Sequence, residues 1–391
     1  MNEKEIAEII NELGEHREQY FNAIAPPIIQ TSNFSFKTVN DLRIAFEDES
    51  KNFIYSRAKN PTLSILSEKL AALDGAEDCL VVNSGAGAIF ISVLANVKTG
   101  DHIISVAKPY TWAQKMFDNV LPRFNISVSY VDGRDIRNFE NAIRDNTTLI
   151  YLETPNSWNF AIQDLEAVAN LAKQKEIITI CDNSYCSPLY QQPISYGIDI
   201  SVQSATKYIS GHSDVVAGVI CGSSAMISKI FNSEYMNLGI GTTPFNAWLL
   251  LRGLRTLPVR LERVSATTKK VIEYLKNIDV VEKILYPLMT EFDQYELAKK
   301  QMIDAGGLFS IILKANSAIE IESFCNNLQH ILMAVSWGGY ESLVIPGIAS
   351  IPHADFDISN EDHRRIRIYI GLEDAGYIID DLNRGFEAMK N

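Results

Sequence analysis

Short apolar runs alternate with helical patterns between about residues 41 and 243 of the chain. The runs that predict buried strands lie at residues 79–82, 102–106, 149–152, 177–181, 198–202 and 216–220. Strands that alternate with helices usually pair in parallel and are covered by helices on both faces. The pattern therefore predicts an α/β fold with a large, mostly parallel sheet.

The pattern differs at the two ends of the chain. Near the start, apolar residues recur at helical spacing over residues 2–13, and the two prolines of residues 25–28 then require an extended backbone. Beyond Thr243, a helix is expected at residues 245–257, where Pro258 stops it. The strand–helix alternation therefore ends near Thr243, and a second structural unit is expected after the parallel sheet.

The last third of the chain predicts a smaller α+β unit. A second helical run reaches about residue 275, and strands are expected at residues 307–313 and 365–370 beside two further helices. The chain has no internal repeat, low-complexity tract or Ser/Gly linker, so we expect tightly joined domains. Their expected bounds are residues 1–50 for an N-terminal arm, 51–245 for the α/β domain and 246–391 for the α+β domain.

Composition narrows the range of partners and compartments. The 391 residues include 35 basic and 48 acidic side chains, and a net charge of −13 disfavours a nucleic-acid partner. No apolar run approaches the roughly 18–20 residues that span a bilayer, and the charged N-terminus has no apolar signal core. Five scattered cysteines form no disulfide framework. These features predict a soluble cytoplasmic protein.

Residues that follow the first predicted strand could bind a phosphate. Ser84, Gly85 and Ala86 lie between that strand and a helix, and small residues at a helix N-terminus leave backbone N–H groups free to face an anion. The third glycine of a dinucleotide fingerprint and the lysine of a P-loop are both missing. Taken alone, these residues are better explained by a tight turn that serves only helix–sheet packing.

Two other strand ends carry ionisable residues. Asp182 follows the strand at residues 177–181, and Lys207 follows the strand at residues 198–202. Because burial of an ammonium group is unfavourable, a lysine near a buried strand suggests an amine with a lowered pKa that can form a Schiff base. Taken alone, Lys207 is better explained as a surface lysine at a loop edge, and Asp182 equally well as a cap of the next segment. An anion site, a carboxylate and an amine together match the phosphate, pyridine nitrogen and aldehyde of pyridoxal phosphate (PLP).

The chain resembles the Cys/Met-metabolism family of PLP-dependent enzymes from Tyr55 to Glu373. The matching segments are YSRAKNPT at residues 55–62, SGA at 84–86, ETP at 153–155, DN at 182–183, SATKY at 204–208, GHSD at 211–214, LRGLRTL at 251–257, GGYESL at 338–343 and RIYIGLED at 367–374. The resemblance implies the PLP-dependent transferase fold of aspartate aminotransferase type (fold type I). It also implies a homotetramer whose N-terminal arms contact neighbouring subunits.

The resemblance assigns a role to each matching position. Lys207 is expected to hold PLP as a Schiff base and to move protons, and Asp182 to pair with the pyridinium nitrogen. Tyr110 is expected to stack on the ring, and Arg367 to bind the substrate carboxylate with the help of Ser336. The residues implied at the phosphate are Gly85, Ala86, Ser204 and Thr206 of the same chain with Tyr55 and Arg57 of a neighbour.

One departure from the family pattern concerns the loop around Tyr110, and two bear on the reaction. Tyr110-Thr111-Trp112-Ala113 replaces the usual Y-G-x-T, while Ser157 and Trp337 resemble the bacterial cystathionine β-lyase branch. We therefore predict β-elimination of cystathionine to homocysteine, pyruvate and ammonia, as in methionine biosynthesis and transsulfuration. Trp337 as a core residue is the alternative interpretation of that position.

Other functions stay open. Methionine γ-lyase, cystathionine γ-lyase, cystathionine γ-synthase and the homoserine-ester sulfhydrylases use the same lysine and tyrosine with one further proton removed from Cβ. A non-catalytic PLP-binding protein is the alternative from a different class. The six histidines and five cysteines show no metal-ligand spacing, so no metal site is expected.

Overall fold

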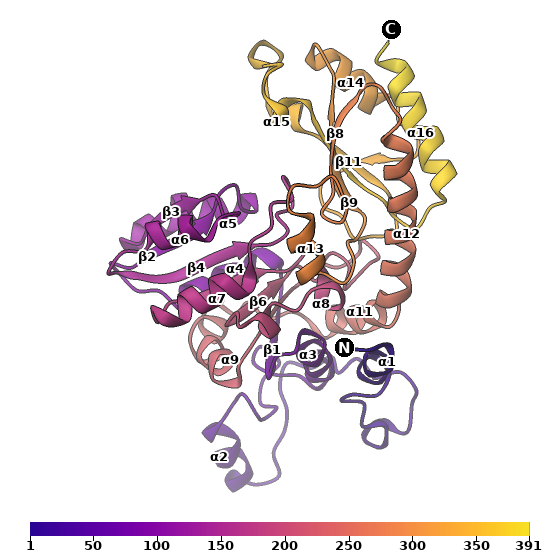
Figure 1. The fold of residues 1–391 in the computed structure, drawn as a ribbon. Helices are drawn as coiled ribbons and strands as arrows, with labels where there is room; N and C mark the ends of the chain where they lie inside the picture. The colour runs from indigo at the N-terminus through magenta and orange to yellow at the C-terminus, as the bar shows by residue number, and fades with distance from the viewer. Residues whose placement is uncertain (391) are drawn as a thin grey trace.

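The computed structural model describes residues 1–390 and contains two β-sheets, which lie apart in Figure 1. The large sheet has seven strands in the order β1-β7-β6-β5-β4-β2-β3, and the small sheet has five in the order β10-β11-β12-β9-β8. The strands of the large sheet are β1 (Asp78–Val82), β2 (His102–Val106), β3 (Ser127–Val131), β4 (Thr147–Glu153), β5 (Ile178–Asp182), β6 (Ile200–Gln203) and β7 (Gly218–Gly222). Those of the small sheet are β8 (Val281–Leu285), β9 (Leu308–Leu313), β10 (Leu332–Met333), β11 (Leu343–Pro346) and β12 (Arg365–Tyr369).

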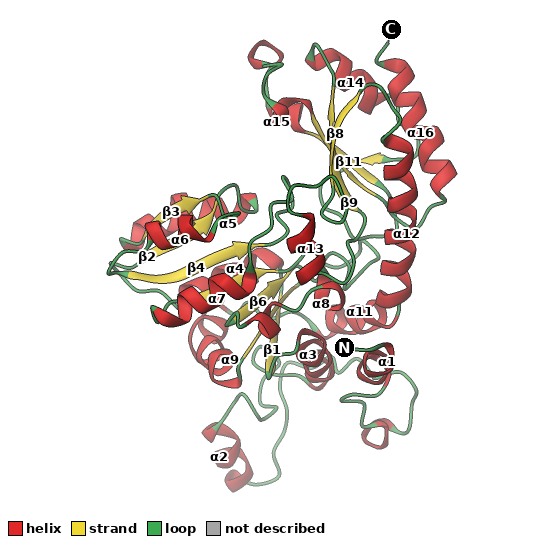
Figure 2. Cartoon of the chain, viewed as in Figure 1, coloured by secondary structure: helices red, strands yellow, loops and turns green. Residues whose placement is uncertain are grey.

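Helices flank both sheets (Figure 2). They are α1 (Glu3–Asn11), α2 (Val39–Glu47), α3 (Pro61–Asp74), α4 (Gly85–Leu94), α5 (Thr111–Lys115), α6 (Ile136–Ala142), α7 (Leu165–Gln174), α8 (Ser187–Tyr190), α9 (Ser224–Ile230), α10 (Met236–Leu238), α11 (Pro244–Arg255), α12 (Leu257–Leu275), α13 (Tyr295–Gln301), α14 (Ala318–Asn326), α15 (Glu361–Arg364) and α16 (Ala375–Ala388). The long helices α12 and α16 lie along one side of the small sheet in Figure 2. Within residues 1–390, none of these helices has both the length and the apolar character that a membrane span requires.

The large sheet confirms the predicted α/β fold. Strands β3, β2, β4, β5 and β6 run parallel, whereas β7 runs antiparallel between β6 and β1. Alternate residues of β4 face opposite sides: Tyr151 packs in the cluster that contains Ile89 of α4, and Ile150 in the cluster that contains Leu165 of α7. Helices therefore cover both faces, as the alternation of strands and helices predicted.

Six predicted strands overlap observed ones, and the seventh, β3, was missed. Its sequence Ser-Val-Ser-Tyr-Val carries polar residues at alternate positions, because β3 lies at the edge of the sheet and only Val131 is buried. A search for continuous apolar runs therefore passes over it.

The small sheet contains both predicted strands, as β9 and β12, together with β8, β10 and β11, which the sequence pattern did not indicate. Helix α11 ends at Arg255 instead of Leu257, and Pro258 lies in the first turn of α12 instead of terminating a helix. A first-turn position suits proline because the N–H groups there have no intrahelical partner. The domain boundaries at residues 50 and 245 stay predictions.

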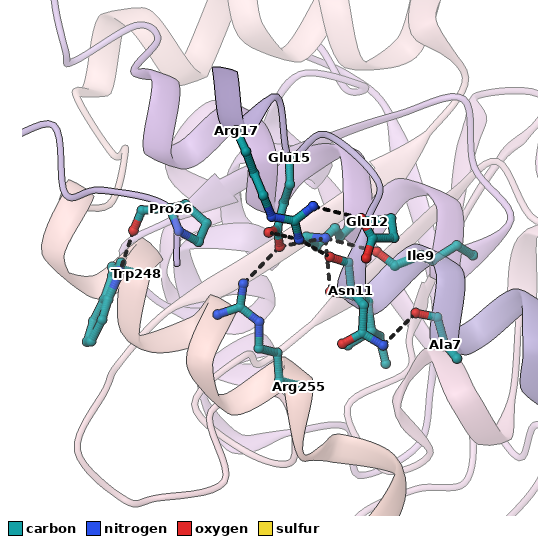
Figure 3. Close-up of polar contacts among 11 residues, drawn as sticks. Ala7, Ile9, Asn11, Glu12, Glu15, Arg17, Pro26, Trp248 and Arg255 are labelled. Carbon is teal, nitrogen blue, oxygen red and sulfur yellow. Dashed lines mark hydrogen bonds and ion pairs between the residues drawn. The ribbon is translucent and has the colours of Figure 1, made fainter. Parts of the chain in front are cut away.

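The N-terminal segment is anchored by a buried carboxylate (Figure 3). Glu15 forms ion pairs with Arg17 at 3.0 Å, Lys69 at 3.2 Å and Arg255 at 2.8 Å, and its side chain is fully buried. The Nζ atom of Lys69 also donates hydrogen bonds to the backbone carbonyls of Ile9 and Ile10. Helix α1 is thereby fixed against the body, whereas α2 projects away from both sheets (Figure 1).

Candidate active site

Most of the predicted site residues line a cavity of about 170 Å³ at the carboxyl ends of the large-sheet strands. Those residues are Gly85, Ala86, Tyr110, Ser157, Asp182, Ser204, Thr206, Lys207 and Trp337. A second cavity of about 620 Å³ shares Tyr110, Ser157, Lys207 and Trp337 with the first and adds Ser336 and Arg367. We call the first the inner cavity and the second the vestibule.

Tyr55 and Arg57 line neither cavity. Both are exposed, and the Arg57 guanidinium lies 5.8 Å from the centre of the Tyr55 ring. Within one chain they are therefore not part of the site. Their predicted place at a neighbouring subunit's phosphate stays a prediction.

The start of α4 forms one wall of the inner cavity. Ser84 caps the helix by accepting a hydrogen bond from Gly87 N at 3.0 Å, and the helix begins at Gly85. A Cβ atom on Gly85 would lie 2.8 Å from the Cβ atom of Ser204, so only glycine allows this close approach. The free N–H groups at the helix start and the Ser204 hydroxyl together form a concave surface suited to an anion.

Asp182 is the last residue of β5 and lines the inner cavity. Its carboxylate accepts a hydrogen bond from Ser184 N at 2.9 Å, and Ser184 Oγ accepts one from Ser204 N at 2.6 Å. Burial raises the pKa of Asp182 above its usual range. A cationic ring nitrogen opposite this carboxylate would favour its ionised form.

Lys207 lies where the inner cavity meets the vestibule. Its Nζ atom donates a hydrogen bond to Ser336 Oγ at 2.5 Å and lies 4.4 Å from the centre of the Trp337 ring. Burial, with a smaller contribution from Arg367, lowers the pKa of Lys207 to about 8. A substantial share of the amine is therefore neutral near physiological pH, as a nucleophile requires.

The close approach of the Lys207 backbone explains why position 338 is a glycine. Gly338 has a φ of +89°, and a Cβ atom there would lie 2.7 Å from the backbone carbon of Lys207. The turn that carries Ser336 and Trp337 can therefore approach the lysine only with glycine at this position.

Glu153 is a site residue that the sequence analysis missed. It ends β4, is buried, and accepts hydrogen bonds from the backbone N–H groups of Tyr110 at 2.5 Å and Ser157 at 2.8 Å. Burial and the neighbouring Asp182 raise the pKa of Glu153 to about 7. An acidic residue directly after the apolar run at residues 149–152 is the signal that could have identified it, as it did Asp182.

Arg367 lies on β12 of the small sheet and faces the vestibule. Its guanidinium lies 5.6 Å from the ring centre of Trp158 and 5.4 Å from that of Trp337. Nη1 donates a hydrogen bond to the carbonyl of Ser157 at 3.1 Å, and burial lowers the pKa of Arg367 to about 10. The guanidinium thus keeps donors available for an anionic ligand. Trp158, which orients it, was also missed from the sequence.

These residues fit PLP. The helix start and Ser204 suit its phosphate, the buried Asp182 suits its pyridine nitrogen, and the amine of Lys207 suits its aldehyde. The Thr206 hydroxyl, which was expected to bind the phosphate, already has partners within the chain. It accepts a hydrogen bond from Ala217 N at 3.0 Å and donates one to Ala217 O at 3.2 Å. Among the described residues, none pairs with the buried Nε1 of Trp337, so this donor is also available to a ligand.

Comparisons with known proteins agree with this chemistry. A family model described as "Cys/Met metabolism PLP-dependent enzyme" matches residues 8–387. L-methionine gamma-lyase of Treponema denticola is 36% identical over 377 residues, which cover 94% of each chain. Cystathionine gamma-lyase of Macaca fascicularis is 35% identical over 381 residues, which cover 96% of this chain and 92% of that protein.

The solved structures include a cystathionine gamma synthase from Xanthomonas oryzae pv. oryzae in complex with aminoacrylate and cysteine. It matches with a TM-score of 0.90 and 29% identity, covering 98% of each chain. This match confirms the PLP-dependent transferase fold (fold type I) that the resemblance implied. With family model, relatives and fold in agreement, the chain belongs to the Cys/Met-metabolism family of PLP-dependent enzymes, and PLP is its cofactor.

Proposed function

We propose that the protein is a PLP-dependent carbon–sulfur lyase that eliminates the γ-substituent of a sulfur amino acid. The observation that carries the proposal is the buried amine of Lys207, with its lowered pKa, between the inner cavity and the vestibule. The preference for the γ-position is supported by the relatives described as γ-lyases. With methionine, the balanced reaction takes up water and yields methanethiol, 2-oxobutyrate and ammonia.

Each side chain has a defined task in this proposal. When bound, PLP withdraws electrons from the Cα atom of the amino acid. Arg367 binds the substrate carboxylate through its free guanidinium donors, and Ser157 fixes Arg367 through the backbone carbonyl. The neutral amine of Lys207 accepts the proton from Cα, because its lowered pKa leaves the lone pair available.

Reaction at the γ-carbon needs one further proton transfer. A proton on Cβ must also be removed, and Lys207 is the basic group that the vestibule and the inner cavity share. The hydrogen bond to Ser336 directs the amine toward the vestibule side of the site. Tyr110 lines both cavities and is the residue expected to stack on the cofactor ring.

β-Elimination of cystathionine, the reaction first predicted from the sequence, is the second candidate. It is favoured by the position of Trp337, whose indole lies against both Lys207 and Arg367 and limits the room around the substrate side chain. The resemblance of Ser157 to the bacterial cystathionine β-lyase branch, stated from the sequence, supports the same candidate. The relatives favour the γ-reaction, so we place β-elimination second.

Product identification tests the proposal. Purified holoenzyme is incubated with methionine and, separately, with cystathionine, and the oxo acids are separated chromatographically. We expect 2-oxobutyrate as the main product, with the Lys207→Ala variant as the inactive control. Pyruvate as the main product would replace the proposal with β-elimination, and formation of neither oxo acid would reject the lyase function.

We also propose that the active assembly is a homotetramer with composite sites. The exposed Tyr55 and Arg57, together with exposed apolar residues of the N-terminal segment such as Phe21 and Ile24, support an interface with a neighbouring subunit. Chromatography with light scattering tests the subunit number, for which we expect four.

A further inference from the structure

A single buried carboxylate connects two loops of the site. Glu153 is the last residue of β4 and is 3% exposed. Its Oε2 atom accepts a hydrogen bond from the backbone N–H of Tyr110 at 2.5 Å, and its Oε1 atom accepts one from the backbone N–H of Ser157 at 2.8 Å. Tyr110 ends the loop between β2 and α5, whereas Ser157 lies in the loop that follows β4. Each oxygen of the carboxylate therefore binds a different loop.

A second contact joins the same two loops. Asn156 is buried, and its Nδ2 atom donates a hydrogen bond to the carbonyl of Lys108 at 2.8 Å. Lys108 has a φ of +52°, a conformation that residues other than glycine rarely adopt. Such a backbone persists only where its surroundings hold it in place. We therefore expect the path of the chain from Lys108 to Tyr110 to depend on the contacts with the second loop.

The first loop sets the place of the Tyr110 ring. Tyr110 directly precedes α5, and its side chain forms no hydrogen bond that caps this helix. The ring lines both the inner cavity and the vestibule. Because stacked aromatic rings tolerate only a limited range of offsets, a shift of this backbone would change how the ring packs on the cofactor.

The second loop leads to Arg367. Ser157 is bound by Glu153 at its N–H group, and its carbonyl accepts a hydrogen bond from Arg367 Nη1 at 3.1 Å. Burial lowers the pKa of Arg367 to about 10, and the nearby Glu153 opposes this shift. The carboxylate of Glu153 thus acts on the guanidinium through one intervening residue and through its charge.

We propose that Glu153 is a positioning residue that places Tyr110 at the cofactor ring and, through Ser157, places Arg367 at the substrate carboxylate. The inference rests on the proposed function, since it concerns how that site holds its cofactor and its substrate. All of these contacts lie within one chain, so they do not depend on residues that a neighbouring subunit contributes. Loss of the carboxylate should therefore disturb both tasks together.

Two ligands that are not cleaved test the route through Arg367. Norleucine has a methylene group in place of the sulfur of methionine, and pentylamine is norleucine without its carboxylate. Both are titrated into the holoenzyme at about pH 8.5, above the pKa of about 7 of Glu153, and binding is followed by cofactor absorbance. In Glu153→Met, which removes both acceptors, the preference for norleucine over pentylamine should fall about five- to ten-fold. An unchanged preference would overturn the proposal.

Circular dichroism of the bound PLP tests the route through Tyr110. The visible band reports the groups that pack against the cofactor ring, so a displaced Tyr110 should weaken it in Glu153→Met without any substrate. A change in the band alone, or in the ligand preference alone, would show that the carboxylate serves only one loop. Either result would overturn the joint role.

A second variant separates position from charge. Glu153→Asp keeps the negative charge and both oxygens but shortens the side chain by one methylene group, so the carboxylate cannot reach both loops. We expect this variant to weaken the band and to lower the ligand preference, as Glu153→Met does. Values equal to those of the parent would show that the site requires only the charge, and the positioning role would be rejected.

Asp381 offers a matched control. It is fully buried and accepts hydrogen bonds from the backbone N–H groups of Gln329, His330 and Ile331, which lead into β10. It is not among the described residues that line either cavity. Asp381→Asn should lower the melting temperature but leave the ligand preference and the visible band unchanged. If it alters them as the Glu153 variants do, their effects come from lost stability and the proposal fails.

The outcomes separate this inference from the proposed function. If no oxo acid forms from any sulfur amino acid, but both Glu153 variants change the band and the preference, the lyase proposal fails and the positioning role is supported. If 2-oxobutyrate forms from methionine, but neither variant changes the two readouts, the lyase proposal is supported and the positioning role fails.

Discussion

The Nζ atom of Lys207 lies 2.5 Å from the Oγ atom of Ser336, although the two residues stand 129 positions apart. Lys207 follows β6 of the large sheet, whereas Ser336 lies between β10 and β11 of the small sheet. The contact therefore joins the two sheets at the proposed reaction centre. The small-sheet part of the chain thus supplies the hydrogen-bond acceptor of the amine, together with Trp337 and Arg367 in its surroundings.

The first prediction concerns this amine. Lys207→Ala should abolish covalent attachment of PLP and lower turnover by about 10²- to 10⁴-fold, the usual contribution of a positioned acid–base group. Borohydride reduction followed by peptide mass spectrometry locates the attachment, with the exposed Lys98→Ala as a matched control. Attachment at another lysine would contradict the assignment.

The same group predicts a pH dependence. Only the neutral amine attacks an aldehyde, and the pKa of Lys207 is lowered to about 8. The rate at which the apoenzyme takes up PLP should therefore rise with pH and level off above about pH 8, as stopped-flow absorbance can measure. A rate that keeps rising toward pH 10.5 would show that the amine has the pKa of an ordinary lysine.

Arg367→Lys tests the proposed carboxylate site. A lysine keeps the charge but loses the planar pair of donors, so kcat/KM should fall about 10- to 100-fold, mainly through a higher KM. Steady-state kinetics give the two constants separately, and Arg263→Lys, on the exposed face of α12, is the control. An unchanged KM would place the substrate carboxylate elsewhere.

Trp337→Leu tests whether the indole determines the choice between β- and γ-elimination. Removal of this contact changes discrimination by about 1–3 kcal/mol, so the ratio of 2-oxobutyrate to pyruvate should rise about 5- to 150-fold. The product ratio and the melting temperature are measured on the same sample. A large fall in melting temperature with an unchanged ratio would assign Trp337 to core packing.

Mixed assemblies test the composite site. Lys207→Ala and Arg57→Ala chains are each expected to be inactive, but in a random mixture about one quarter of the sites would combine intact residues from both chains. Activity after subunit exchange is measured against each variant alone. Exchange shown by mass spectrometry without any return of activity would exclude a contribution of Arg57 to a neighbour.

Asp74 predicts how stability depends on pH. Burial raises its pKa from 3.8 to about 6, and Gln203 donates a hydrogen bond to it at 3.2 Å. The folded protein therefore holds a proton that the unfolded chain releases, so Asp74 should contribute a fall of roughly 2 kcal/mol to the free energy of unfolding as pH rises from about 4 to 6. Denaturant unfolding of the apoenzyme measures the slope. The Asp74→Asn variant should show a smaller dependence of the unfolding free energy on pH, whereas the variant Asp78→Asn, at an exposed residue, should show the same dependence as the parent.

The sequence located the residues that lie directly after buried strands. Asp182 and Lys207 follow continuous apolar runs of the parallel sheet, and parallel strands bring such ends to one edge. Glu153 meets the same condition but was not selected, because its role as an acceptor for Tyr110 and Ser157 depends on how two loops approach each other. The place of Glu153 after an apolar run could therefore be read from the sequence, but the approach of the two loops could not.

Contacts between the two sheets were the least predictable part of the site. The resemblance supplied Arg367 and Ser336, but no periodicity indicated that Trp158 would lie beside the Arg367 guanidinium. Strands β8, β10 and β11 were missed for a related reason. Both residues of β10 are exposed and β8 is partly exposed, whereas β11 is mostly buried but has only four residues.

The cluster around Glu15 has a consequence for how the chain can vary. One carboxylate forms ion pairs with Arg17, Lys69 and Arg255, and the Lys69 side chain is only 1% exposed. Without Glu15, this ammonium would keep only backbone carbonyls as partners, and an unpaired buried charge is strongly destabilising. We therefore expect positions 15 and 69 to change together during evolution. Homologous chains that have lost the acid should also have lost the lysine, and a neutral pair should be found more often than either single change.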